Sequence, residues 1–291
     1  MFVRLRSPLT LALMILFAGP AGAAPITDFA VYGVQEVFIG ANSEITGMVG
    51  SGNMVIGDVG LNGGAGIYGD VRSGDDVNLA NNCFVTGTVT NPGSFTMGSG
   101  STVGAHITAM PDLPTLPAAS VFSHGVTNQS VGNGGTITLA PGAWGDISLG
   151  GSATLNLSAG VYYLKKLTSG NGLDININLA GGTTKIYVTE AVSFGGSEVF
   201  LTGGDAQDVS VETLASGSNA FRSGGGTHWQ GNVFAPNGQI HIGSGGGGSS
   251  YVGYLWAGRD VDIEHGVMGS IPEPATLALL AIAVGYGSRR R

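Results

Sequence analysis

Three acidic residues near the C-terminal end of the chain are spaced so that they could act together. Asp260, Asp262 and Glu264 are separated by single residues, with Arg259 and His265 at the two ends of the group. On a β-strand, successive side chains point to opposite faces, so all three carboxyl groups would share one side. Glycoside hydrolysis requires paired carboxylates about 5 to 10 Å apart. The three acids are therefore candidate catalytic residues of a polysaccharide-active enzyme.

The same spacing also has a purely structural interpretation, which we favour. Val261 and Ile263 would point into a core, and the acids would form the solvated face of an amphipathic strand. Two other acidic pairs, Asp75 with Asp76 and Asp205 with Asp208, carry no stronger signal. No Gly-x-Ser-x-Gly nucleophile motif sits between a strand and a helix. We assign no catalytic residue and expect a non-enzymatic protein, with a polysaccharide lyase or hydrolase as the alternative.

The sequence predicts no cofactor and no metal centre. The histidines lack the spacing of metal ligands; they are His106, His124, His228, His241 and His265. The stretch from Gly63 to Asp70 faintly resembles a calcium-binding glycine–aspartate repeat, but it departs in spacing and does not recur in tandem. A structural Ca²⁺ therefore stays open only as a minor alternative.

The charge of the chain argues against nucleic acid as a partner. Between residues 25 and 270 there are six basic and eighteen acidic residues, a net charge near −12. Nucleic-acid binding depends on Lys and Arg that neutralise phosphates. Only 10% of residues are charged and 53 of 291 are glycine, yet 43% are hydrophobic. That apolar content is too high for a disordered chain, so we expect a folded, acidic, β-rich body.

Short apolar segments recur through the body at intervals of about twenty residues. In the first half a Gly-x-Val/Ile step begins at Gly47, Gly69 and Gly87, and again at Gly104 with one extra residue before Ile107. In the second half, residues 137–144 resemble residues 155–162 at a shift of 18, a register that also aligns Leu149 with Leu167. A looser third copy, residues 177–182, follows at a further shift of 22.

This period predicts an all-β fold, a parallel β-solenoid. Each rung of such a coil consists of two or three short strands, and it buries its apolar face only by stacking on its neighbours. A body of this length would form on the order of 12 rungs and a rod about 55 Å long. An antiparallel sandwich, which also has short strands and frequent turns, is the alternative.

A proline-rich segment interrupts the repeats. Pro111, Pro114 and Pro117 cannot belong to a central strand, so an extended segment lying along the solenoid is expected. The predicted organisation is a signal peptide (1–24), a first solenoid region (25–109), the Pro-rich segment (110–119), a second solenoid region (120–268) and a sorting or anchor tail (269–291).

Aromatic and threonine residues offer two further possibilities. Trp144 and Tyr162 align one rung apart and Tyr163 follows, which indicates a packed ring ladder or, alternatively, a platform for sugar stacking. A flat threonine array would suggest ice binding. However, the Thr-x-Thr pairs at residues 86–88 and 136–138 do not fall on successive rungs.

The two ends of the chain carry export signals. Arg4 and Arg6 precede the apolar stretch 9–18, and the small residues Ala21, Ala23 and Ala24 mark a cleavage region for a signal peptide. At the other end, an apolar run (275–286) predicts a short hydrophobic helix. Three basic residues follow it, and they would stay on the cytoplasmic side of a membrane; these are Arg289, Arg290 and Arg291.

This tail resembles the PEP-CTERM signal of exported bacterial proteins, on the motif Pro272, Glu273 and Pro274 followed by the apolar run and the arginines. The resemblance implies export through the translocon and recognition by exosortase, a membrane transpeptidase. It also implies retention in the membrane or envelope, or release to the extracellular matrix after processing. We therefore expect a structural or adhesive protein associated with exopolysaccharide.

Overall fold

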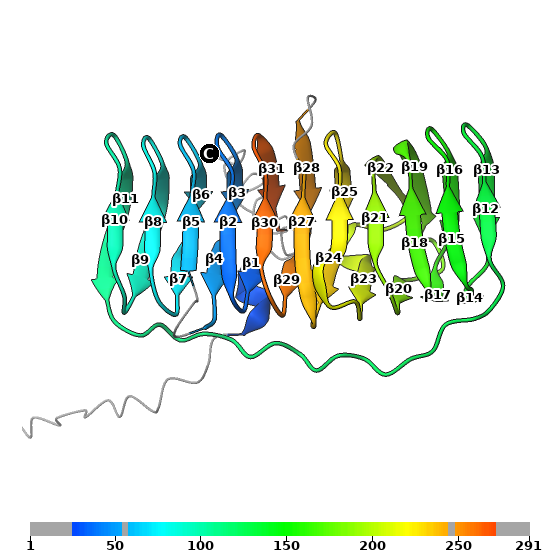
Figure 1. Ribbon diagram of the computed structural model, residues 1–291, viewed down its shortest axis with the longest axis horizontal. Helices are drawn as coiled ribbons and strands as arrows, with labels where there is room; N and C mark the ends of the chain where they lie inside the picture. The colour runs from blue at the N-terminus through cyan, green and yellow to red at the C-terminus, as the bar shows by residue number, and fades with distance from the viewer. Residues whose placement is uncertain (1–24, 54–57, 244–247, 272–291) are drawn as a thin grey trace, which may run out of the picture.

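The computed structural model describes residues 25–53, 58–243 and 248–271. These residues form one parallel β-solenoid, drawn as a rod in Figure 1. The predicted signal peptide and the tail from Pro272 onward, with its hydrophobic helix, lie outside the described residues. Within the described part of the chain there is no α-helix, only two short 3-10 turns, η1 (Ile26–Asp28) and η2 (Ala206–Asp208). No helix found there is long and apolar enough to cross a membrane.

The solenoid has three faces, and each rung contributes one strand to each face. Face 1 is an 11-stranded sheet, so the rod has eleven rungs and is about 50 Å long. Its strands, in spatial order, are β10 (Phe95–Met97), β8 (Val77–Leu79), β5 (Asp58–Leu61), β2 (Glu36–Ile39), β30 (Val261–Ile263), β27 (Gly238–Ile242), β24 (Gly217–Ser223), β21 (Val192–Phe194), β18 (Lys166–Ser169), β15 (Asp146–Leu149) and β12 (Gln129–Val131).

Faces 2 and 3 belong to one continuous sheet, because β9 and β11 run across both. Face 2 contains β11 (Thr102–Thr108), β9 (Phe84–Asn91), β6 (Gly66–Tyr68), β3 (Glu44–Thr46), β31 (Val267–Ser270), β28 (Ser249–Val252), β25 (His228–Gln230), β22 (Gly196–Thr202), β19 (Asn171–Asn178), β16 (Thr154–Ser158) and β13 (Thr136–Leu139). Face 3 continues from β11 and β9 into β7 (Val71–Ser73), β4 (Met48–Ser51), β1 (Phe29–Gly33), β29 (Leu255–Ala257), β26 (Asn232–Ala235), β23 (Val209–Thr213), β20 (Thr184–Val188), β17 (Gly160–Leu164) and β14 (Gly142–Ala143).

The described strands pair in parallel, which confirms the predicted solenoid and excludes the antiparallel sandwich. Alternation along each strand places apolar side chains inside the coil, where they stack in columns. Val49, Val71 and Val89 form one such column, as the Gly-x-Val steps predicted. The fourth step departs from this column, because β9 has one residue more than β11 at a register shift, which places His106 rather than Ile107 against Val89.

The predicted register of the second half is right on one face and wrong on the next two. Leu139 pairs with Leu157 at the predicted shift of 18. The connection that leads into β17 is two residues longer than the equivalent connection into β14, so Tyr162 pairs with Gly142 and not with Trp144. On face 1 it is Ile147, not Leu149, that pairs with Leu167.

The third copy was also placed two residues too far along. Leu155 pairs with Ile175, a shift of 20 where 22 was predicted. Errors of two residues keep the same side chains inside, because the side-chain period of a strand is two. The core composition could therefore be predicted even where the register was not.

The order of the rungs along the rod differs from their order in the sequence. The first solenoid region runs from β1 outward to β10 and β11 at one end of the rod, and the second runs from β12 and β13 at the other end back to β30 and β31. The two regions meet at a seam inside the rod. There β30 pairs with β2, β31 with β3 and β29 with β1. The last rung consists of β30, β31 and β1, so its third strand comes from the beginning of the body.

Residues 109–128, here called the strap, connect the two ends of the rod (Figure 1). The strap lies along the solenoid, as expected for the Pro-rich segment, and contacts it at several rungs. The Tyr32 hydroxyl donates to the Pro114 carbonyl at 3.1 Å, and Arg72 Nη1 donates to the Asp112 carbonyl at 3.2 Å. Ser120 donates two hydrogen bonds to the carboxylate of Glu212, one from its backbone N–H at 2.6 Å and one from its hydroxyl at 2.7 Å.

Candidate functional site

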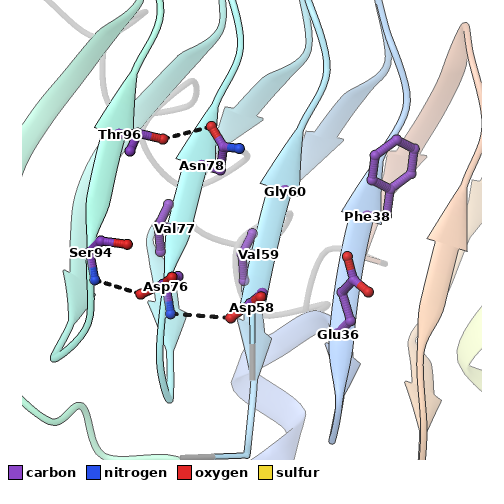
Figure 2. Close-up of a pocket in the computed structure, with 10 residues that line it drawn as sticks. All are labelled: Glu36, Phe38, Asp58, Val59, Gly60, Asp76, Val77, Asn78, Ser94 and Thr96. Atoms are coloured by element: carbon purple, nitrogen blue, oxygen red, sulfur yellow. Dashed lines mark hydrogen bonds between the residues drawn. The ribbon is translucent and has the colours of Figure 1, made fainter. Parts of the chain in front are cut away.

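Acidic side chains line up on the outer surface of face 1, next to the seam. In-register stacking places Asp58 beside Glu36, and Asp76 continues this line on the next rung (Figure 2). On the rung at the other side of Glu36, Asp260 extends the line. They line two adjoining depressions of about 270 and 220 Å³ that share Glu36 and Phe38. We call this pair of depressions the acidic hollow.

The structure places Asp262 on the outer side of β30, with Asp260 directly before and Glu264 directly after the strand, all three partly exposed. Val261 and Ile263 are fully buried, as the strand interpretation required. Asp260 and Asp262 line the acidic hollow, whereas Glu264 does not. Asp262 and Glu264 instead contact the two ring nitrogens of one histidine, His241 Nδ1 and Nε2, each at 3.0 Å.

The flanking residues predicted with the acids have other roles. Arg259 Nε donates to the Gln35 side chain at 3.3 Å, and His265 is exposed. His241 joins the three acids from the preceding rung, 21 residues before Asp262, whereas Glu36 and Asp58 join them from rungs that lie far away in the sequence. Sequence reasoning missed them because the seam brings residue 36 next to residue 260, and no local spacing announces that contact.

The acidic hollow favours the protonated forms of its carboxyl groups. Partial burial raises the pKa of Glu36, and the charges of Asp260, Asp58 and Asp262 raise it further. Burial likewise raises the pKa of Asp260, with a further contribution from Asp262 and an opposing one from Arg259. For Asp58, burial again raises the pKa, against a lowering by the backbone N–H of Asp76.

The pKa of His241 is also raised, but here the cause is stabilisation of the charged imidazolium by acidic neighbours, whereas the carboxyl groups are destabilised in their charged form. The hydrogen bond to Asp262 is the largest cause, and the charges of Asp262 and Glu264 add to it, against burial and the nearby Arg222. The hollow and the histidine therefore both bind protons more readily than the unfolded chain does.

We expect the rod to be more stable in mildly acidic solution than in alkaline solution. Acids with raised pKa values bind more protons in the folded state, so stability falls as the pH rises from about 4 through those values. The stabilisation from His241 is complete below about pH 6.5 and is lost as the pH rises through its raised pKa. Glu36→Gln should raise the melting temperature at neutral pH, with the gain disappearing near pH 4.

Thermal unfolding followed by circular dichroism across this pH range measures the effect. Glu198→Gln, at an exposed acid on face 2 outside the hollow, is the matched control and should leave the profile unchanged. A Glu36→Gln chain whose melting profile parallels that of the unmodified chain would show that the hollow carries no such repulsion.

The remaining acidic candidates serve local backbone structure. Asp205 caps η2 by accepting from Gln207 N at 2.8 Å, and Asp208 accepts from the backbone of Asp205 at 3.2 Å. Asp70 accepts from Thr88 N at 2.8 Å in the next rung, and Asp76 accepts from the backbone of Ser94. Across the described ranges, no three His, Cys, Asp or Glu side chains are grouped in a way that could hold a metal ion.

The aromatic residues singled out from the sequence do not form an open platform. Tyr162 is buried, with its hydroxyl donating to the Ser158 carbonyl at 2.9 Å. Tyr163 stacks on Tyr187 at 5.5 Å, and Phe122 of the strap covers both rings. The ladder is therefore part of the packing between strap and rod.

A groove of about 440 Å³ opens on face 3, farther along this row. Four partly exposed aromatic side chains line it, namely Tyr187, Phe234, Tyr254 and Trp256. Polar groups lie among the rings, including those of Lys185, Gln207, Ser210, Glu212 and Asn232. We call this site the aromatic groove.

Register across four rungs builds this groove. Glu212 pairs with Phe234, and Phe234 pairs with Trp256, so these outward side chains form one row. Ser120 holds Glu212 in place, and the Trp256 ring donates to the Phe29 carbonyl at 2.9 Å. Burial of Tyr32, the next residue in the row, raises its pKa to about 12. The sequence signal is a 22-residue spacing from Glu212 to Phe234 to Trp256, visible only once the rung length is known.

The threonine pairs considered for ice binding lie near opposite ends of the rod. Residues 86–88 belong to β9, and residues 136–138 belong to β13. They therefore form no continuous array, as the sequence indicated.

Comparison with known proteins identifies the tail. Residues 270–291 match the PEP-CTERM protein-sorting motif. Among curated proteins, no sequence matches the chain significantly.

Three solved structures resemble the rod at low sequence identity. An ice-binding protein from the Antarctic ascomycete Antarctomyces psychrotrophicus is 17% identical, with a TM-score of 0.39 over 86% of this chain and 97% of that one. The ice-binding protein_1 DUF3494 domain of Shewanella frigidimarina is 15% identical, with a TM-score of 0.38 over 86% and 96%. An ice-binding protein from an Antarctic Flavobacteriaceae bacterium is 14% identical, with a TM-score of 0.35 over 84% and 80%. Likeness at this level supports no conclusion about function.

The sorting motif implies processing by an exosortase-type enzyme and a protein that is exported, whether membrane-associated or secreted. A parallel β-solenoid with an acidic hollow and an aromatic groove thus precedes this signal. The chain carries a PEP-CTERM protein-sorting motif behind a solenoid body.

Proposed function

We propose that this protein is a non-enzymatic component of the cell envelope or extracellular matrix that binds exopolysaccharide in the aromatic groove. The single observation that carries the proposal is the groove itself: four aromatic rings with polar side chains between them. Aromatic faces pack against the C–H surfaces of sugar rings, while amide, hydroxyl and charged groups bind the sugar hydroxyls. The PEP-CTERM motif supports an exported location, where such polymers occur.

The charge of the body favours a neutral polysaccharide over an acidic one. The region from residue 25 to residue 270 has a net charge near −12, which repels polyanions at low ionic strength. Among the described residues that line the groove, Lys185 is the only one with a basic side chain. We therefore expect binding that favours neutral glucans and that changes little with salt.

Binding of dextran and alginate to the purified protein, measured by calorimetry, tests this proposal. Tyr254→Ala should weaken dextran binding about tenfold or more, because it removes one ring of the groove. Tyr68→Ala, at a half-exposed tyrosine on face 2, is the matched control and should bind as the unmodified chain does. Equal loss in both variants, or no binding at all, would contradict the proposal.

A polysaccharide lyase or hydrolase is the second candidate, favoured by Asp260 and Asp262 in the acidic hollow. The raised pKa of Asp260 is what a general acid needs. The same incubations distinguish the two functions. Release of reducing ends or unsaturated products, abolished by Asp262→Ala, would replace the binding function with an enzymatic one.

A further inference from the structure

Among the residues that the structure describes, no capping element covers either end of the rod. At one end β10 is the last strand of face 1, and β11 pairs only with β9; at the other end, β12 is last, and β13 and β14 pair only with β16 and β17. No helix of the described chain covers either end. Terminal repeats of solenoids normally carry a polar cap, because an open rung exposes both backbone groups and the end of the core.

Apolar side chains at both ends are exposed although they occupy inward positions. Met97 pairs with the buried Leu79, yet it is half-exposed in its terminal rung. At the other end, Val131 pairs with Leu149 and Ile137 pairs with Leu155, and both are only partly buried. The core therefore stops at each end without a closing layer.

Charge is absent from both ends of an otherwise acidic rod. Between Asp76 and Asp146 the chain contains one Asp, Glu, Lys or Arg residue, Asp112, and it lies in the strap. The terminal rungs, residues 92–108 and 129–144, contain none of these residue types. Native proteins protect open sheet edges chiefly with charged side chains, and these edges lack them.

We propose that the rods associate head to tail, with the β10–β11 end of one copy docked on the β12–β13 end of a second copy. The joint would extend each of the three faces by parallel pairing. The seam already shows this geometry, since β30 and β31 pair in parallel with β2 and β3, which come from the other end of the described sequence. A heterologous contact of this kind does not close on itself, so it produces filaments.

The side chains at the two ends are complementary in size. One inward column of the solenoid ends in His106 at the first end and in Gly142 at the second. The His106 ring stacks on Phe95 at 4.2 Å, and a side chain at Gly142 would meet nothing within 4 Å. In the joint, the imidazole of one copy would cover the open space above the glycine of the next.

Sedimentation velocity of the full chain in a non-ionic detergent tests the joint, with electron microscopy to show the shape of the particles. We expect reversible, concentration-dependent association into straight rods whose lengths are multiples of about 50 Å. Met97→Lys and Val131→Glu each place a charge where the joint would bury it, and each should weaken association about tenfold or more. Mixing the two variants should restore it, because their altered ends then pair opposite charges.

Met268→Lys is the matched control, since Met268 has the same exposure as Met97 but lies on face 2 at the seam. It should associate as the unmodified chain does. A chain that stays monomeric at every soluble concentration overturns the proposal. So does association that Met97→Lys and Val131→Glu disturb no more than Met268→Lys does.

Discussion

Val31→Asp is expected to open the seam and to cost about 4 kcal/mol of unfolding free energy, because it buries a carboxylate with no partner. Val31 is fully buried in β1, between Leu255 of β29 in the second region and Val49 of β4 in the first region. β29 and β1 come from different regions of the chain, so their contact depends on strand hydrogen bonds and packing rather than on a chain connection. The seam should therefore separate before the rest of the rod unfolds.

Native-state hydrogen exchange measures this prediction strand by strand. Amides of β29, β30, β31 and of β1 to β4 should lose protection in Val31→Asp, while the middle of each region keeps it, since solenoid stability is largely a sum of neighbouring contacts. Val121→Asp, at a fully exposed valine of the strap, is the control. A uniform loss of protection along the rod would show that the seam is no weaker than any other rung junction.

Gly258→Ala is expected to destabilise the rod by about 3 kcal/mol, the upper end of the usual cost of overpacking. A Cβ at this position would overlap the carbonyl oxygen of Pro236 in the neighbouring rung. The Gly258 N–H also donates to the Ala235 carbonyl at 2.8 Å, which holds the two turns together. To relieve the overlap, the backbone at residue 258 or at Pro236 would have to move away, and this movement would break the hydrogen bond between the two turns.

Denaturant unfolding of Gly258→Ala and Gly60→Ala separates this effect from a general cost of losing glycine. A side chain at Gly60 would make only ordinary contact with Phe38, at 3.5 Å. Gly60→Ala should therefore stay within about 1 kcal/mol of the unmodified chain. A loss of stability in Gly258→Ala as small as that in Gly60→Ala would contradict the prediction, because it would mean that the backbone at Pro236 can accept a Cβ at residue 258.

The solenoid itself could be predicted from the sequence because its cause is local. Each rung repeats the same alternation of apolar and polar residues, so the spacing of Val49, Val71 and Val89 alone predicts that they stack in one column. The register was less predictable, since turns vary by two residues without changing which face is buried. Tyr162 thus lost its predicted partner Trp144 but stayed inside the core.

The candidate sites depended on contacts that spacing does not reveal. The acids from 260 to 264 were visible as a strand face, but Glu36 joins them only through the seam. Phe234 and Trp256 are 22 residues apart, and this interval means little until the rung length at that point of the rod is known. The strap and the seam determine which rungs become neighbours along the rod, and the local pattern of the sequence does not contain this arrangement.

The position of the seam also decides how the rod would resist being pulled. The described chain leaves the solenoid at Ile271, directly after β31, whose neighbours on face 2 are β28 and β3. Of the other ten rungs, four lie on one side of this exit and six on the other. Tension on the sorting tail would therefore have to shear a strand that is hydrogen-bonded along both edges, whereas a tail leaving from an end rung could be peeled away one bond at a time. A cell that held the protein by this tail would therefore hold the rod at an inner rung, that of β31, rather than at one of its ends.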